Sequence, residues 1–404
     1  MKRQQPPRKG APPRGRRRRQ HQPPPQGRLP AGEAPDIPLI DLRRQYAALR
    51  EELLDAASRV MDSGHYIMGP EAEAFEAEFA AALKSPHCAG VSSGTQALQI
   101  ALDACGVRPG DEVAVPAFTF IATATAVATL GARPVFVDVD PVSLTMDPAD
   151  LERRLTPKTR AVIPVHLYGA PADLDPIMAL AAERGLRVVE DCAQAHLTRY
   201  RGRCVGTFGA FGAFSFYPTK NLGAAGDAGA LTTSDASLDE IARVLRNCGR
   251  DPASWFAHVR VASNCRLDEF QAALLRVKLR RLAEWTEARR RIAARYRSAL
   301  AGLPLRLPPE DPEGGAHAYH MFVVQTVRRD ALAEHLGREG VRTAVYYAAP
   351  VHLQPAFDHL GIGEGALPES ERAAREVLSL PMFPELTPAE ADRVTAAVRG
   401  FFEG

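Results

Sequence analysis

The sequence predicts an α/β protein in which helices wrap a mostly parallel sheet. From Ile37 onward, short apolar runs of strand length alternate with longer segments of helical spacing, which is the order that a parallel sheet with crossover helices requires. A length of 404 residues, of which 46% are hydrophobic and 24% charged, allows two or three domains and a sizeable buried core.

The first 36 residues differ from this body in composition. They contain ten Lys/Arg, two Asp/Glu and nine prolines, and they hold too few large apolar side chains to offset the entropy of ordering the chain. We therefore expect them to be disordered. The run Arg16 to Arg19 could contact polyphosphates or nucleic acid. A passenger extension or an early start codon explains it more simply, so nucleic acid is not an expected partner.

In the body of the chain, the elements follow from the spacing of apolar residues. Apolar residues three and four positions apart predict helices, which we place at residues 42–61, 71–83, 94–105, 119–130 and 174–184. Short apolar runs bounded by turn residues predict buried strands, which we place at residues 112–115, 134–137, 161–165, 186–189, 210–216 and 228–232.

The C-terminal part begins with one long predicted helix. Residues 268–300 are arginine-rich and amphipathic, which is typical of a connector from a larger domain to a smaller one. A strand at 319–327 and helices at 330–337 and 388–402 follow it. This mixture predicts a smaller α+β domain at the C-terminus.

Other features concern the compartment of the protein. No apolar run approaches the roughly 18 residues that a membrane span needs, and the N-terminus lacks the apolar core of a signal peptide. The six cysteines are scattered without metal-ligand spacing such as C-x-x-C, so reduced thiols are expected. These features favour a cytoplasmic protein with no membrane partner and no metal site.

Lys220 is the residue whose chemistry is most informative. It lies in the segment Ser215-Phe216-Tyr217-Pro218-Thr219-Lys220-Asn221-Leu222-Gly223, directly after a predicted strand. A lysine amine can deprotonate and form a Schiff base with a carbonyl, whereas an arginine guanidinium cannot. Asp191 ends an earlier strand, and such an acid and amine would suit the ring nitrogen and the aldehyde of pyridoxal phosphate (PLP). A surface lysine and a helix-capping aspartate explain these two residues equally well.

Further residues could complete a PLP site. The Ser92 to Thr95 turn opens a helix whose free N–H groups would suit a phosphate, although Ser-Gly-Thr is also a common helix cap. Ser215 could add a hydroxyl to the same phosphate. Phe120 could stack on the ring, whereas Phe118 is better explained as core. Gln194 could contact the ring hydroxyl, and His196 is equally explained as a substrate contact or a polar core residue.

Taken in order, these motifs resemble the DegT/DnrJ/StrS family of sugar aminotransferases, which have the aspartate aminotransferase fold. The resemblance runs from Ile37 to the C-terminus. Its matching segments lie at residues 64–71, 91–95, 190–196, 215–223, 245–247, 264–269, 351–356 and 378–382. It implies a large domain at residues 37–280 with a mostly parallel seven-stranded sheet. A smaller C-terminal domain would follow at residues 281–404, with residues 1–36 as an extension.

The resemblance also implies roles for individual residues. Lys220 would bond the cofactor and move protons, and Asp191 would pair with the ring nitrogen. The implied contacts with PLP are Gly94, Thr95, Phe120, Asp191, Gln194, Ser215, Lys220 and Asn264. Because Asn264 would reach in from a partner subunit, the resemblance implies a homodimer with a shared active site.

The implied reaction moves an amino group from glutamate to a keto group of a nucleotide-linked sugar. The segments at 66–69 and 352–356 are similar to branches that aminate C3 of dTDP-3-keto-6-deoxyhexoses. Branches acting at C4, inosose aminotransferases and aminohydroxybenzoate synthases are alternatives, as is a catalytically retired regulatory relative. Tyr217, His196 and Tyr347 are the expected substrate contacts. The family pattern is broken at Ala228, at Leu197-Thr198 and at Tyr346.

Overall fold

The computed structural model describes residues 36–311 and 314–404. The predicted disorder of the N-terminal extension lies outside the described residues, except for Asp36. Within the described residues, no helix is long and apolar enough to cross a membrane. All six cysteines are free thiols.

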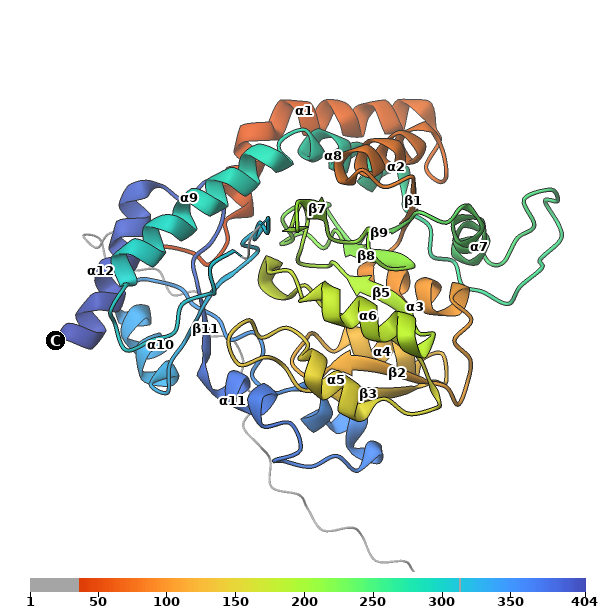
Figure 1. The fold of residues 1–404 in the computed structure, drawn as a ribbon. Coiled ribbons are helices and arrows are strands. Elements are labelled where there is room, and N and C mark those ends of the chain that lie inside the picture. Colours follow the sequence, from red (N-terminus) through yellow and green to blue (C-terminus); the bar gives the residue numbers. More distant parts are fainter. Residues whose placement is uncertain (1–35, 312–313) are drawn as a thin grey trace, which may run out of the picture. The chain divides into compact units, whose positions relative to one another are not determined.

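A seven-stranded sheet carries the fold, with the strand order β1-β9-β8-β5-β4-β2-β3 (Figure 1). Its strands are β1 (His87–Val91), β2 (Glu112–Pro116), β3 (Arg133–Val137), β4 (Thr159–Val162), β5 (Arg187–Asp191), β8 (Phe211–Ser215) and β9 (Gly229–Thr233). Neighbouring strands are parallel except that β9 runs antiparallel to both β8 and β1. The predicted α/β fold with a mostly parallel sheet is therefore confirmed.

Alternation of side chains along the strands places helices on both faces of the sheet. Val113 and Val115 of β2 share a buried cluster with the helices α3 (Gly94–Ala104), α4 (Ala122–Ala128) and α7 (Ala236–Arg246). Ala114, between those valines, packs with α5 (Pro148–Arg154) and α6 (Leu174–Arg184). Successive residues of a strand point to opposite faces, so these two sets of helices cover opposite faces of the sheet.

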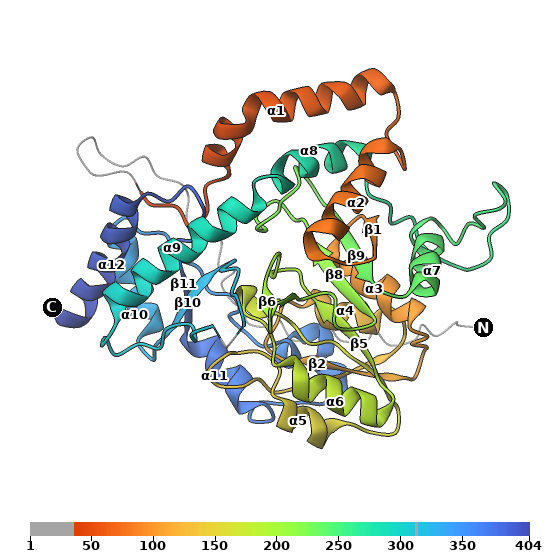
Figure 2. The same ribbon diagram turned by 45° about the horizontal axis from the view of Figure 1, so that its top comes forward.

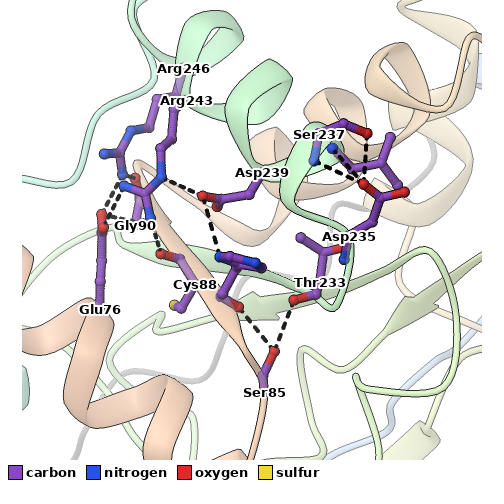
Figure 3. A network of polar contacts seen from close by, with 12 residues as sticks. Glu76, Ser85, Cys88, Gly90, Thr233, Asp235, Ser237, Asp239, Arg243 and Arg246 are labelled. Carbon is purple, nitrogen blue, oxygen red and sulfur yellow. Dashed lines mark hydrogen bonds and ion pairs between the residues drawn. The ribbon is translucent and has the colours of Figure 1, made fainter.

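A network of charged side chains covers the free edge of β1 (Figure 3). The Glu76 carboxylate accepts the N–H of Gly90 at 2.8 Å and also binds the guanidinium groups of Arg243 and Arg246. These two arginines in turn donate to the carbonyls of Cys88 and Gly90. An uncovered edge strand would present unpaired backbone groups, and here α2 (Pro70–Leu83) and α7 satisfy them.

The predicted single helix over residues 268–300 is wrong. The chain instead forms α8 (Glu269–Leu279) and α9 (Leu282–Leu300), separated by Arg280 and Arg281. The two helices bury different surfaces: α8 packs against α1 (Leu42–Ser63) and α2, whereas α9 packs against α12 (Pro388–Glu403). Figure 2 shows α8 beside α1 and α9 beside α12.

The C-terminal residues build a separate buried cluster. The antiparallel strands β10 (Phe322–Gln325) and β11 (Val377–Leu380) contribute to it together with α9, α10 (Arg329–Arg338) and α12. Ile37 also belongs to this cluster. The remaining elements are α11 (Pro368–Glu376), the short pair β6 (Arg199–Tyr200) and β7 (Arg203–Cys204), and three short 3-10 turns.

Candidate active site

A cavity of about 530 Å³ lies where β5 and β8 end and α3 begins. Because β5 and β8 are parallel neighbours, residues at their carboxyl ends meet at one edge of the sheet, where open α/β sheets bind ligands. Most of the predicted site residues line this cavity: Gly94, Thr95, Phe120, Asp191, Gln194, Ser215, Tyr217, Lys220 and Tyr347.

Asp191 ends β5 and is buried at 6% exposure. Its Oδ1 accepts the N–H of Ala193 at 3.1 Å, and its Oδ2 accepts the hydroxyl of Thr123 at 2.9 Å. Burial raises the pKa of Asp191, while these two hydrogen bonds and the charge of Lys220 oppose the rise. Thr119 continues the chain of hydroxyls, with its Oγ1 3.1 Å from that of Thr123.

Lys220 lies in the turn that follows β8, and its backbone N–H donates to the carbonyl of Tyr217 at 2.8 Å. Burial lowers the pKa of the Lys220 amine to about 8, although the charge of Asp191 opposes this shift. No side chain or carbonyl among residues 36–311 and 314–404 accepts a hydrogen bond from its Nζ. The amine is therefore available for proton transfer near neutral pH.

The N-terminus of α3 supplies donors on another wall of the cavity. Ser93 caps the helix by accepting the N–H of Gln96 at 3.2 Å. The first N–H groups of a helix have no intrahelical partner, so those of Gly94 and Thr95 are free to bind an anion. A Cβ on Gly94 would lie 2.7 Å from the Cβ of Ser215. Only glycine lets the helix approach the end of β8 so closely.

Gln194 is fixed by two hydrogen bonds on the third side of the cavity. Its Oε1 accepts the N–H of Tyr168 at 2.6 Å, and its Nε2 donates to the hydroxyl of Tyr347 at 3.0 Å. Phe120 lines the same space, is 54% exposed, and lies with its ring centroid 6.0 Å from that of Tyr347. Phe118 is fully buried, as expected of a core residue.

Two predicted residues lie outside the cavity. His196 is fully buried, and its ring lies against Phe79, Phe214 and Phe216. Its expected contact with the substrate is therefore corrected: His196 is a core residue, because these aromatic rings separate it from solvent. Asn264 is exposed and forms a β-bridge with Asn247, so it does not line the cavity of its own chain.

Behind β5, a buried polar network holds the strand end in place. The Glu190 carboxylate accepts the N–H groups of Gly206, Phe208 and Gly209, and His166 Nε2 lies 3.1 Å from it. His166 Nδ1 accepts the N–H of Ala172, so the proton of the neutral ring lies on Nε2 and is donated to Glu190. Both ring nitrogens of His166 are thus in use. The cluster of His166, Glu190 and Cys192 is therefore explained by hydrogen bonding and gives no support for a metal site.

The sequence reasoning missed several residues of the cavity wall. Thr123, His320 and Met321 all line the cavity, together with Tyr346, which the break in the family pattern had already marked. Thr119 and Thr123 are four residues apart in the helix predicted at residues 119–130, and this spacing could have indicated a shared polar face, although the observed α4 begins only at Ala122. No local pattern points to His320 and Met321, because tertiary packing brings them to the site.

The departures from the family pattern have different consequences for the backbone. Ala228 is buried and has no left-handed backbone conformation, so alanine is tolerated at this position. Leu197 has a φ of 61°, a conformation that glycine adopts at lower cost than leucine. Thr198 is buried and donates its hydroxyl to the carbonyl of Gly169 at 2.8 Å.

Comparison with known sequences finds a family of aminotransferases. The model of the DegT/DnrJ/EryC1/StrS aminotransferase family matches residues 47–399. The dTDP-3-amino-3,4,6-trideoxy-alpha-D-glucose transaminase of Streptomyces venezuelae is 49% identical over 92% of this chain and 97% of its own length. The pleiotropic regulatory protein of Geobacillus stearothermophilus is 46% identical over 91% of this chain and 99% of its own length.

Solved structures agree in fold. The crystal structure of S. venezuelae DesV in complex with a ketimine intermediate superposes with a TM-score of 0.90 at 48% identity, covering 92% of this chain and all of that one. NtdA from Bacillus subtilis with bound cofactor PMP superposes with a TM-score of 0.84 at 31% identity, covering 93% of this chain and 86% of that one.

Fold and site together define an aminotransferase with the PLP-dependent transferase fold, as expected from the sequence. The family match over most of the chain makes the assignment more specific. The chain belongs to the DegT/DnrJ/EryC1/StrS aminotransferase family.

Proposed function

We propose that this aminotransferase binds PLP in the cavity and moves an amino group from glutamate to C3 of a dTDP-3-keto-6-deoxyhexose. The observation that carries the proposal is the meeting of Lys220 and Asp191 in one buried cavity at the ends of parallel strands. The similarity to a transaminase named for a dTDP-3-amino sugar supports the choice of C3. Bound PLP would act as an electron sink for the carbon that exchanges the amino group.

The residues of the cavity suit the parts of PLP. The free N–H groups of Gly94 and Thr95 and the hydroxyl of Ser215 would hold the phosphate. Asp191 would pair with the ring nitrogen, and Gln194 would lie by the ring hydroxyl. The exposed ring of Phe120 would stack on the cofactor. A Cβ on Gly94 would displace Ser215 from this cradle.

Lys220 is suited to move a proton between the carbons of the substrate and the cofactor. With a pKa of about 8, roughly a quarter of the amines would be neutral at pH 7.5, compared with about 0.1% for a lysine with the ordinary pKa of 10.4. The neutral amine can remove a proton and return it as the ammonium form. Burial of the site would keep bulk water from competing for that proton.

The substrate would enter over the aromatic rim of the cavity. Tyr217 and Phe120 are about half exposed and line the opening together with Tyr347. An aromatic rim with few charges suits the apolar 6-deoxy face of a sugar. The nucleotide part would extend beyond this rim.

A second copy of the chain would complete the site. Asn264 is exposed and outside its own cavity, which supports the proposal that it contacts the cofactor phosphate of a partner. The side chains of Tyr66, Trp255 and Phe256 are also exposed, at 49%, 72% and 89%. Exposed aromatic side chains are frequent in protein interfaces, so a homodimer is the proposed state.

We also propose that the two predicted domains divide near the break between α8 and α9. The separate cluster built by α9 to α12 supports a small domain at residues 281–404 beside a large one at residues 37–280. Free thiols throughout the chain support a cytoplasmic location for the enzyme.

The first test is the absorbance spectrum of the full chain with PLP, before and after glutamate is added. We expect a band of lysine-bound PLP that disappears with glutamate in the wild type and in Lys158→Ala, which removes an exposed lysine. Lys220→Ala should lose this response. Near-normal turnover in Lys220→Ala would refute the role of Lys220.

The second test supplies keto-substrates to the glutamate-treated enzyme. A dTDP-3-keto-6-deoxyhexose should be aminated faster than its C4 isomer or an inosose, as measured by mass spectrometry of the product. Faster amination of a C4 keto-sugar or of an inosose would move the enzyme to another branch. Failure to bind PLP would favour a regulatory role, which the name of the Geobacillus stearothermophilus relative also suggests for that protein.

A further inference from the structure

His320 lines the active-site cavity but has no part in the proposed reaction so far. It lies just before β10, two residues from Phe322, and is only 2% exposed. Its chain segment comes from the C-terminal part of the protein, whereas Asp191 ends β5 and Lys220 lies in the turn after β8 of the large sheet. A polar ring placed in this wall of the cavity therefore needs an explanation.

The hydrogen bonds of Asn221 fix the tautomer of His320. Asn221 Nδ2 donates to the carbonyl of Ala318 at 3.0 Å. A carbonyl can only accept, so this contact fixes the orientation of the amide and turns Oδ1 toward His320 Nδ1, at 3.2 Å. Because an amide oxygen also only accepts, Nδ1 must carry the proton. In the neutral ring, Nε2 then has an unshared electron pair and no proton.

The surroundings keep this ring neutral. Burial lowers the pKa of His320 well below its usual value, and the positive charges of Lys220 and Arg289 lower it further, as do His196 and His317. No carboxylate among the described residues hydrogen-bonds to the ring. Burial and the neighbouring positive charges thus oppose protonation of the ring.

The backbone of His320 is held as firmly as its ring. Arg289 of α9 donates through Nη1 to the carbonyls of Tyr319, His320 and Met382. The Nε2 atom of His320 makes no hydrogen bond to any described residue, yet it is not among the fully enclosed, unpartnered atoms, unlike both ring nitrogens of His196. His320 thus offers the cavity a rigid hydrogen-bond acceptor.

Lys220 is the group in the cavity that needs such an acceptor. Its amine is buried and has no hydrogen bond to any residue that the structure describes. In the proposed function Asp191 pairs with the cofactor ring, so its carboxylate is taken when PLP is bound. A lysine that has been released from the cofactor and has gained a proton would then lie in a buried site without a fixed anionic partner.

We propose that His320 is a positioning residue, whose unprotonated Nε2 accepts a hydrogen bond from the amine of Lys220 and holds it while it is not bonded to the cofactor. The catalytic consequence rests on the proposed function. The structure has no hydrogen bond between the Lys220 amine and any described residue, so the proposed bond requires this amine to turn toward His320 within the cavity that both residues line. It can be tested without PLP. Asn221 acts through His320 by fixing its tautomer.

The first measurement needs no variant. In the cofactor-free full chain at pH 7.5, ¹⁵N-labelled histidine should show a proton on Nδ1 of His320 and none on Nε2. The His320→Gln spectrum assigns the signals, because those of His320 disappear from it. A proton on Nε2, or on both nitrogens, would overturn the proposal even where other variants do not fold.

The second measurement is the pH dependence of the acetylation of Lys220, followed by mass spectrometry in the cofactor-free chain. A hydrogen bond between an ammonium group and a neutral acceptor favours the ammonium form. Removing this bond in His320→Phe should therefore lower the midpoint by about one to two pH units. His320→Gln, whose amide oxygen can take the place of Nε2, should stay near the wild type.

His317→Phe is the matched control. It removes another buried imidazole of the same segment. The His317 ring stacks on that of Tyr319, with 4.0 Å between the ring centroids, and it does not line this cavity. Its midpoint should not change. An unchanged or raised midpoint in His320→Phe would refute the hydrogen bond, since loss of a positive imidazolium would raise it. If these shifts occur but glutamate leaves bound PLP unchanged, the proposed function fails and only the hydrogen bond between His320 and Lys220 stands.

Discussion

Thr123→Val tests whether the hydroxyl groups behind Asp191 control the protonation of its carboxylate. Thr123 Oγ1 donates to Asp191 Oδ2 at 2.9 Å, and the two residues are 1% and 6% exposed. Valine has nearly the same shape as threonine but no hydroxyl. The variant therefore leaves the Asp191 carboxylate with only the N–H of Ala193 as a hydrogen-bond donor within the described part of the chain.

The size of the effect follows from the strength of this bond. A hydrogen bond to a charged group contributes about 1.5–3 kcal/mol, and one pKa unit corresponds to about 1.4 kcal/mol. Loss of the Thr123 hydroxyl should therefore raise the pKa of Asp191 by about one to two units. Burial already raises this pKa, so the variant adds to an existing shift. The ionised carboxylate is the form that would pair with the cofactor ring.

The assay is the pH dependence of kcat/KM for glutamate, followed by the absorbance of bound PLP. We expect the acid limb of the profile to move to higher pH by about one to two units, with activity recovering toward that of the wild type at higher pH. Thr123→Ser should restore the wild-type profile. Thr119→Val removes a hydroxyl that contacts Thr123 but not Asp191, so its shift should be smaller. Identical acid limbs in folded, PLP-binding Thr123→Val and wild type would refute the reasoning.

Two further predictions concern stability. Glu76→Ala should lower the free energy of unfolding in urea by about 3–5 kcal/mol, because it leaves the buried guanidinium of Arg246 without its partner, while the exposed control Glu183→Ala should change it by less than about 0.5 kcal/mol. Burial lowers the pKa of His196 to about 3 in the folded chain. Below about pH 6.5 the unfolded state therefore binds more protons, and this residue lowers the free energy of unfolding by about 1.4 kcal/mol for each pH unit of acidification. His196→Leu should lose this contribution to the pH dependence of stability between pH 6.5 and 5, and an equal pH dependence in variant and wild type would contradict the assignment.

The sheet could be predicted wherever its strands are apolar on both faces. Six of its seven strands follow from short apolar runs, with errors of a few residues at their ends. The exception is β1 (His87–Val91), which has a histidine, a cysteine and a glycine and only one β-branched residue. Its place at the edge is held by β9 and by the Glu76 network, which are tertiary contacts that no local pattern reveals.

The break between α8 and α9 escaped prediction for a related reason. Residues 268–300 contain neither proline nor glycine, so helix propensity gives no signal for an end. The break becomes intelligible only from the packing: Lys278, near the end of α8, is buried and donates through Nζ to the carbonyl of Gly223 at 2.7 Å. The following helix packs against α12 instead.

The candidate site also contains some residues that the sequence could indicate and others that it could not. Lys220, Asp191 and Gly94 could be found because each lies at the end or start of a predictable element, and parallel strands bring such positions to one edge. Their catalytic and cofactor roles remain predictions. The roles of Thr123 and His320 could not be predicted, because they depend on hydrogen bonds to Asp191 and Asn221 that form only in the folded chain.

The cavity depends on a contact between two distant parts of the chain. Gln194 is held between Tyr168 and Tyr347, and the hydroxyl of Tyr168 in turn donates to the carbonyl of Tyr346. Tyr168 is buried in a cluster that also contains Val323 of β10. Gln194 and Tyr347, which would contact the cofactor ring and the sugar, are thus positioned by one shared hydrophobic cluster. Substitutions that loosen this cluster should weaken cofactor binding without touching the cofactor, because they release Gln194 from both of its hydrogen bonds.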